Sequence, residues 1–155
     1  MSATANAGRV RRIRLYLTGA TTFSGQVDTL AGSSTTAGST DGTGSAATFT
    51  TPRGITVGTD RNIYVVSGNR IRKIAPCGAV TTFAGQSSTA AYTDTALAQN
   101  SRFETAWAIM GMSDSGYDNL YVTDNTRIRL IAPSYTVTNV ATLPCAPLLL
   151  SLIHI

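Results

Sequence analysis

The stretch NRIRKIAPCGAVTTFAGQ, residues 69–86, decides the fold because the chain repeats its features in order. Its Arg-Ile-Arg triplet occurs three times, and the triplets begin at Arg12, Arg70 and Arg127, spaced by 58 and 57 residues. Two further segments recur in the same order: NIYVV (62–66) as NLYVT (119–123), 57 residues later, and FTTPRGITV (49–57) as FETAWAIMG (103–111), 54 residues later. Repetition at a nearly fixed period predicts one structural unit built several times.

The composition indicates strands rather than helices. Of the 155 residues, 43% are hydrophobic, but only 13% are charged, against a typical share of about 25%. Lys73 is the only lysine and Glu104 the only glutamate, so residues that build helix surfaces are scarce. Short runs of Val, Ile, Thr and Tyr between glycines predict an all-β fold. Neither a signal peptide nor an apolar run long enough for a membrane helix is present, so we expect no membrane association.

Each repeat is predicted to contain four short strands. In the second copy these are residues 54–57, 63–67, 70–75 and 79–85, separated by turns rich in Gly, Asn and Pro. A long crossing segment rich in Ser, Thr and Gly follows each set of strands. A four-stranded antiparallel meander with such a crossing is typical of a β-propeller blade. The strands show little polar alternation, which predicts that neighbouring blades cover both faces of each sheet.

The repeats divide the chain into five segments. They are an N-terminal extension (1–10), a partial blade of outer strands (11–32), a blade with crossing loop 33–48 (33–85), a blade with crossing loop 86–102 (86–143) and a tail (144–155). Such a chain forms an arc rather than a ring, so we expect it to join further blades or to assemble. The last six residues, LSLIHI, match a reading frame of a common sequencing adapter, and we interpret them as read-through; a tail docked on the last sheet is the alternative.

The quoted segments resemble the NHL-repeat β-propeller family. The resemblance covers about residues 11–143 and is strongest over residues 51–85. It implies a propeller, commonly of six blades, of which this chain would be an arc. Two departures stand out: Ala106-Trp107-Ala108 replaces Pro-Arg-Gly in the later copy, and the acidic residue that follows the family's second strand is present as Asp124 but replaced by Ser67 in the earlier copy.

The repeat also assigns structural roles to residues at recurring positions. Ile13, Ile71 and Ile128 should pack between sheets, and Tyr64 and Tyr121 should lie in the core. The arginines of the triplets should lay their stems along the sheet and keep their charged ends in water or in ion pairs. Asp124 is the expected partner of Arg127 or Arg129.

No residue set predicts a catalytic site. The only histidine, His154, lies in the tail, which argues against a histidine-containing metal site. Asp41 and Asp94, in the crossing loops, are candidate calcium ligands, although each loop offers one such carboxylate. We therefore expect no cofactor. For Cys77 and Cys145 the sequence favours free buried thiols over a disulfide.

The remaining features point to interactions. Arg9, Arg11, Arg12 and Arg14 form a basic cluster, and net charge is +4, which admits an RNA-binding propeller. Trp107 opens a first strand, where packing between blades is favoured over a ligand platform. We expect a non-enzymatic scaffold that binds protein through rim loops. The alternatives are a lyase or hydrolase with catalytic residues on other blades, and the RNA binder. The hydroxyl-rich composition favours a secreted or cell-surface protein.

Overall fold

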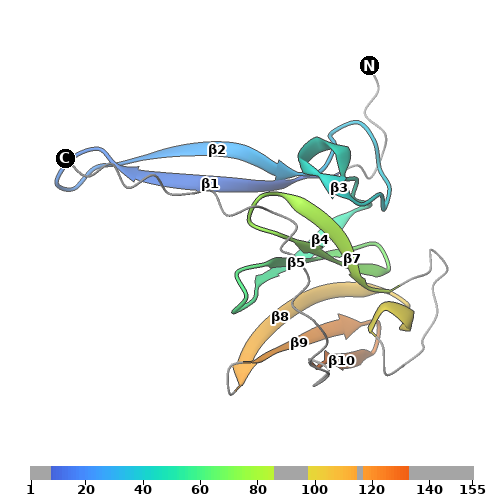
Figure 1. The fold of residues 1–155 in the computed structure, drawn as a ribbon. Coiled ribbons are helices and arrows are strands. Elements are labelled where there is room, and N and C mark those ends of the chain that lie inside the picture. The colour runs from blue at the N-terminus through green and yellow to red at the C-terminus, as the bar shows by residue number, and fades with distance from the viewer. Residues whose placement is uncertain (1–7, 86–97, 115–116, 133–155) are drawn as a thin grey trace, which may run out of the picture.

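The described residues of the chain fold into three antiparallel β-sheets that follow one another in a stack (Figure 1). This computed structural model describes residues 8–85, 98–114 and 117–132. Besides strands, the described residues form two short 3-10 helices, η1 (Gly44–Ala46) and η2 (Ala98–Asn100). None of the helices in this part of the chain is long and apolar enough to cross a membrane.

The middle sheet is the complete repeat unit. Its strand order is β3-β7-β6-β5-β4, and every neighbouring pair is antiparallel. The strands are β3 (Gly42–Thr43), β4 (Pro52–Val57), β5 (Ile63–Ser67), β6 (Arg70–Ile74) and β7 (Ala79–Ala84). The four-stranded meander predicted from the sequence is therefore confirmed. The crossing loop, residues 33–48, adds β3 as a fifth strand against the outer edge of β7.

The last sheet repeats the first three strands of this unit. It consists of β8 (Ala106–Asp114), β9 (Tyr117–Asp124) and β10 (Arg127–Ile131), in the order β10-β9-β8. β8 and β9 pair with a register shift between Ala106 and Ile109, and β4 and β5 show the same irregularity between Pro52 and Ile55. The predicted fourth strand of this blade lies outside the described residues.

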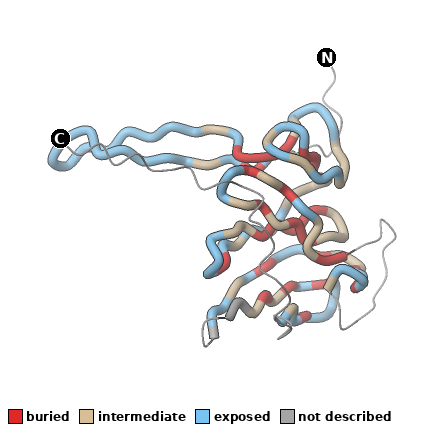
Figure 2. The backbone as a smooth tube through the Cα atoms, in the orientation of Figure 1, coloured by how far each residue is buried: buried red, intermediate tan, exposed pale blue. Residues whose placement is uncertain are grey.

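The first unit is a hairpin of β1 (Val10–Leu17) and β2 (Phe23–Ala31). It has the two outer strands that the sequence predicted, but it extends well beyond the stack, and most of its length is exposed (Figures 1 and 2). Its base packs against the middle sheet through Val10, Leu30 and Ala31.

The hairpin corrects the alignment of the first Arg-Ile-Arg triplet. Val10 lies opposite Ala31 and Ile13 opposite Val27, as Ile71 lies opposite Ala84 and Ile74 opposite Val80. The glycines that end β2 and β7 agree: a Cβ on Gly32 would lie 2.5 Å from the Gly8 carbonyl oxygen, and one on Gly85 would lie 2.5 Å from that of Asn69. The structural equivalent of Arg70-Ile71-Arg72 is thus Arg9-Val10-Arg11, because strand pairing sets the register and valine fills the isoleucine position.

Both faces of the middle sheet are covered, as its apolar strands predicted. Val65, Ile74 and Val80 pack against the hairpin base together with Ala47 and Phe49. On the other face Tyr64, Val66, Ile71 and Ala84 pack against residues of the last sheet and its approach, namely Phe103, Ala106, Ile109, Leu120 and Val122. Burial is concentrated at these two interfaces (Figure 2). Each interface therefore joins two successive units of the repeat.

Two of the three isoleucines predicted to pack between sheets do not do so. Ile71 is fully buried, whereas Ile13 is 66% and Ile128 77% exposed. Ile13 is equivalent to Ile74, which faces the preceding unit, and Ile128 is equivalent to Ile71, which faces the following unit. Neither has a neighbouring sheet within the described part of the chain. Tyr64 is buried as predicted, and Tyr121 is half-buried.

Cys77 also differs from its prediction. It lies in the turn between β6 and β7, is exposed, and is disulfide-bonded. The free buried thiol expected for Cys77 is therefore wrong: the tight turn that joins the ends of β6 and β7 leaves its side chain at the surface. The sequence contains one other cysteine, Cys145, which lies outside the described residues.

Substitution of Gly85 should show how closely the strands approach at the repeat junction. Gly85 has φ of 83°, and an added Cβ would overlap the Asn69 carbonyl oxygen and Phe103. We expect Gly85→Ala to lower the free energy of unfolding by about 2–4 kcal/mol, because strain and overlap add. Gly44→Ala is the matched control, since Gly44 has φ of 59° with nothing within 4 Å; it should cost only about 1 kcal/mol. Equal losses in denaturant titrations would contradict this account.

Candidate functional site

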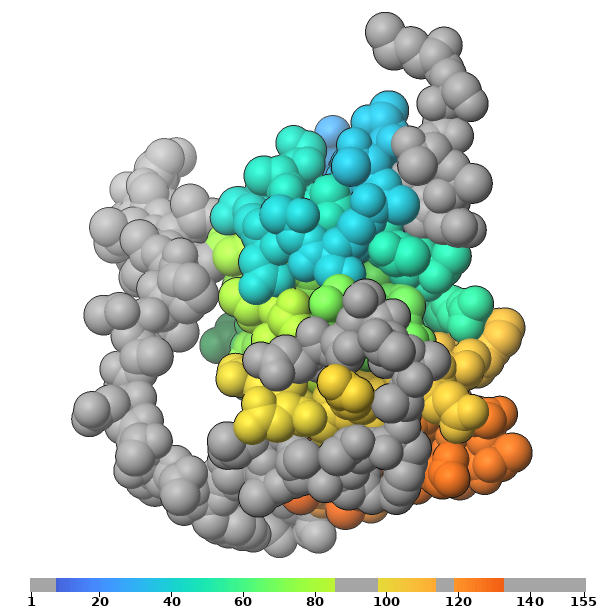
Figure 3. All heavy atoms as spheres, turned by 90° about the vertical axis from the view of Figure 1, so that its right-hand side faces the viewer, coloured from blue at the N-terminus to red at the C-terminus, as the bar shows by residue number. Residues whose placement is uncertain are grey.

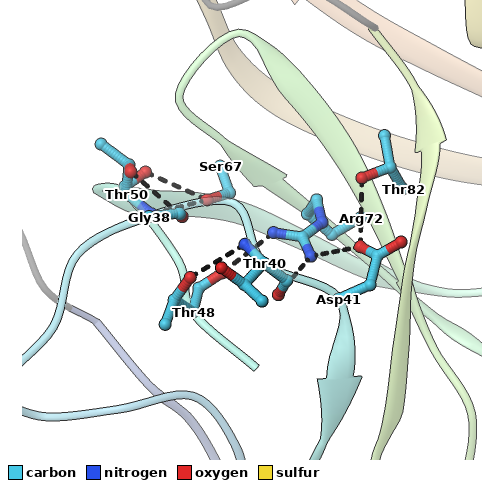
Figure 4. Close-up of polar contacts among 8 residues, drawn as sticks. All are labelled: Gly38, Thr40, Asp41, Thr48, Thr50, Ser67, Arg72 and Thr82. Carbon is cyan, nitrogen blue, oxygen red and sulfur yellow. Dashed lines mark hydrogen bonds and ion pairs between the residues drawn. The ribbon is translucent and has the colours of Figure 1, made fainter. Parts of the chain in front are cut away.

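A buried arginine holds the crossing loop against the middle sheet. Arg72, on β6, is 0% exposed. Its Nη1 donates to the Thr48 carbonyl oxygen at 2.9 Å, and its Nη2 donates to the Thr40 carbonyl oxygen at 3.0 Å and to Asp41 Oδ1 at 2.7 Å. The guanidinium lies 5.4 Å from the centre of the Phe49 ring. Burial lowers the pKa of Arg72, and the contact with Asp41 opposes that effect. One side chain thus joins three points of the loop (Figure 4).

Hydroxyl groups complete this attachment. The Thr50 amide donates to Ser67 Oγ at 3.0 Å, and Ser67 Oγ donates to the Thr50 carbonyl oxygen at 3.1 Å. Within the loop region, Thr50 Oγ1 bonds the Gly38 carbonyl oxygen and the Thr40 amide donates to Thr48 Oγ1. These contacts hold the loop as an ordered layer (Figure 4), and its atoms form part of the surface seen from the side in Figure 3. Ser34, Thr36 and Ser45 remain exposed on it.

The last sheet contains the same arrangement with a different carboxylate. Arg129, equivalent to Arg72, is buried and forms an ion pair with Asp124 at 3.2 Å. Its Nη1 also donates to the Arg102 carbonyl oxygen, and its guanidinium lies 4.5 Å from the Phe103 ring centre. Asp124 Oδ1 accepts from the amides of Glu104 and Thr105 at 2.8 and 2.7 Å. Arg127 pairs with Glu104 instead, at 3.4 Å.

This comparison explains why Ser67 occupies the acidic position in the middle sheet. Ser67 accepts from the Thr50 amide as Asp124 accepts from the equivalent Glu104 amide in the last sheet, but it brings no charge to the buried arginine. Asp41 of the crossing loop supplies that charge. Neither this pairing nor the burial of Arg72 was predicted from the sequence. An arginine beside Ile71 in an apolar strand, combined with a neutral Ser67, was the signal that another carboxylate must approach.

The innermost strands of the two sheets lie side by side and expose apolar side chains. The Gly111 amide of β8 donates to Thr56 Oγ1 of β4 at 3.1 Å. A guanidinium from β4, that of Arg53, lies 3.8 Å from the centre of the Trp107 ring. Trp107 therefore contacts the neighbouring blade, as predicted, yet 56% of its surface stays exposed. Further exposed apolar side chains lie on the same two strands: Ile55, Val57, Met110 and Met112.

The basic cluster is partly neutralised within the hairpin. Asp28 on β2 pairs with Arg12 at 2.6 Å and with Arg14 at 3.2 Å. The hydrogen bond from Arg12 lowers the pKa of Asp28. Arg9 and Arg11 are exposed at the start of β1. The four arginines therefore do not form a continuous unpaired basic surface, and this arrangement does not favour the RNA alternative.

Of the two candidate calcium ligands, only Asp41 lies in the described part of the chain. Asp41 contacts Arg72 and Thr82 in this structure, and Asp94 lies outside the described residues. Across residues 8–85, 98–114 and 117–132, no group of three or more His, Cys, Asp or Glu side chains is placed to hold a metal ion. The described residues thus provide no multidentate metal site.

Antiparallel sheets that repeat along the chain and stack face to face define an arc of a β-propeller. A family model of the teneurin NHL domain matches residues 22–107, more than half of the chain. The chain therefore belongs to this NHL family. A search of the curated proteins gives no match.

Two solved structures from Bacteroides thetaiotaomicron VPI-5482 support the fold assignment. A structural genomics protein of unknown function is 29% identical, with a TM-score of 0.62 over 70% of this chain and 28% of its own. An auxiliary nutrient binding protein is 25% identical, with a TM-score of 0.57 over 72% of this chain and 29% of its own. The chain thus spans less than a third of the length of either structure.

Proposed function

We propose that this chain is a non-enzymatic propeller scaffold that binds protein through its rim loops, with the crossing loop 33–48 as the principal contact. The observation that carries the proposal is the attachment of this loop to the middle sheet by the fully buried Arg72. A loop that is already ordered loses less conformational entropy when it binds, which favours affinity. Loops held on a rigid frame are also where recognition residues concentrate.

The chemistry of the loop supports a protein partner. Its exposed residues are mainly Ser and Thr, which both donate and accept hydrogen bonds and adapt to polar peptide surfaces. The similar structure described as an auxiliary nutrient binding protein is consistent with a binding role for this architecture. An enzyme with catalytic residues on other blades remains the alternative function, and no feature of the described residues favours it.

Selection from a phage-displayed peptide library would test the proposal. We expect selected peptides to bind the Ser34→Glu/Thr36→Glu variant at least about tenfold more weakly, because two exposed loop contacts become charged. Thr21→Glu/Ser24→Glu is the matched control, since it adds the same charges to exposed positions of the hairpin. Peptides that lose affinity only for the control variant, or for neither variant, would contradict binding through the loop.

A further inference from the structure

The hairpin has an unpaired strand edge whose natural partner can be identified from the middle sheet. β1 and β2 correspond to β6 and β7 by their register and by the glycines that follow them. In the middle sheet, the second edge of β6 pairs with β5, with Val65 opposite Arg72 and Ile63 opposite Ile74. β1 has β2 as its only neighbour among the described strands. The inner half of this blade is therefore missing from the described structure.

The hairpin face beside that edge carries side chains similar to those that the middle sheet buries at the equivalent positions. Arg11 takes the place of Arg72, Ile13 that of Ile74, and Val27 that of Val80. In the middle sheet these three positions are covered by Thr48, Phe49 and the Asp41 carboxylate of the crossing loop. On the hairpin, Arg11 is exposed and its side chain has no ion-pair partner among the described residues, and Ile13 and Val27 are 66% and 47% exposed.

We propose that the β1 edge and the face formed by Arg11, Ile13 and Val27 are a docking site for an inner half-blade of NHL type. This partner consists of a crossing loop with a carboxylate and an aromatic residue, followed by two apolar strands. Its second strand adds to β1 through main-chain hydrogen bonds, in the register that β5 has on β6. Its carboxylate pairs with Arg11, and its aromatic residue covers Ile13. The proposal does not depend on the rim-loop function, because the crossing loop 33–48 of this chain takes no part in it.

The complementarity of charge distinguishes this partner from a second copy pairing β1 to β1. An antiparallel β1–β1 contact would place the Arg9 and Arg11 side chains of both copies, which do not pair with Asp28, on adjacent strands. Like charges on paired strands are unfavourable. An acidic crossing loop removes that repulsion and supplies the apolar cover as well.

A peptide with the sequence of residues 38–67 of this chain is the probe, because it contains a crossing loop with Asp41 and Phe49 and the strands of β4 and β5. Added in trans to the intact chain, the labelled peptide should bind saturably in fluorescence anisotropy. Ile13→Asp in the chain should weaken binding by about tenfold or more, because an apolar contact is replaced by a charge. Leu17→Asp is the matched control on the same face, four residues further along β1 and beyond the positions equivalent to β6; it should not weaken binding.

A charge reversal tests the predicted register. Arg11→Glu in the chain should weaken binding of the peptide, and Asp41→Lys in the peptide should restore it. Both chain positions are exposed, so thermal melts of the variants should match that of the unaltered chain. Binding that is insensitive to Arg11 and Ile13 would show that the peptide exchanges with β4 and β5 of the middle sheet instead, and would overturn the proposal. Dimerisation of the chain that the peptide does not reduce would overturn it as well.

Discussion

Replacing Arg72 by methionine is expected to lower the free energy of unfolding by about 2–4 kcal/mol. Methionine preserves much of the apolar stem but removes all three hydrogen bonds of the guanidinium. The Thr48 carbonyl oxygen then loses the Arg72 donor, the Thr40 carbonyl oxygen keeps only the Thr48 amide at 3.1 Å, and the crossing loop loses its main attachment. Because Asp41 is half-exposed, it can return to water, so the loss comes chiefly from the buried Thr48 carbonyl oxygen and from the weaker attachment of the loop.

The control for this substitution is Arg14→Met. Arg14 pairs with Asp28, but its side chain is 46% exposed, and surface ion pairs contribute about 0–1 kcal/mol. Denaturant titration of both variants gives the comparison. Hydrogen exchange should in addition show faster exchange of the Thr40 and Thr48 amides in Arg72→Met. Equal stability of the two variants would mean that Arg72 does not hold the loop.

Self-association of the chain is the second large expected effect. The hairpin exposes Ile13, Leu15, Leu17, Phe23 and Val27 on one face, and the last sheet exposes Ile128 and Leu130. Apolar surfaces of this kind, next to an unpaired strand edge, favour association. Light scattering at micromolar concentration should therefore give an average mass at least twice that of the monomer, with or without residues 150–155.

Lysine substitutions on the two faces of the hairpin distinguish the effect of losing apolar contacts from the effect of added net charge on self-association. Leu15→Lys/Leu17→Lys/Phe23→Lys should shift the chain towards the monomer. Tyr16→Lys/Ser24→Lys/Gln26→Lys adds the same charge to the opposite face, as the strand register shows, and should leave association largely intact. If both triple variants become monomeric to the same extent, the apolar face is not the cause. A monomeric, sharply melting unaltered chain would show that the arc is a self-sufficient domain.

The middle sheet could be predicted closely from the sequence because local signals agree there. The turns between residues 57 and 63 and between residues 67 and 70 place β5 where it was expected, residues 63–67, and the strands on either side end within two residues of the predicted bounds. β3 could not be predicted, because two residues inside a Gly- and Thr-rich loop carry no periodic signal. Its pairing depends on the contact of Gly42 with Val80, 38 residues away.

The first Arg-Ile-Arg triplet shows that matching residue types can give the wrong alignment of two repeats. Arg12-Ile13-Arg14 matches the other triplets by letter, but Arg9-Val10-Arg11 matches them by strand register and by burial. The site was harder still to predict. Sequence spacing does not show that Arg72 would be buried, or that Asp41 would replace the carboxylate that Ser67 lacks, because both depend on how a long crossing loop folds back over the sheet.

A double-mutant cycle between Asp41 and Ser67 tests most directly whether the two sheets are versions of one repeat with an exchanged carboxylate. The cycle is best measured by denaturant titration in the Leu15→Lys/Leu17→Lys/Phe23→Lys background, so that association does not contribute. Asp41→Asn should lower the free energy of unfolding by about 1–3 kcal/mol, because Arg72 is left buried without an anion. Adding Ser67→Asp, which recreates the arrangement of Asp124 and Arg129, should recover more than half of that loss. Losses that simply add, or a double variant less stable than Asp41→Asn alone, would contradict the account.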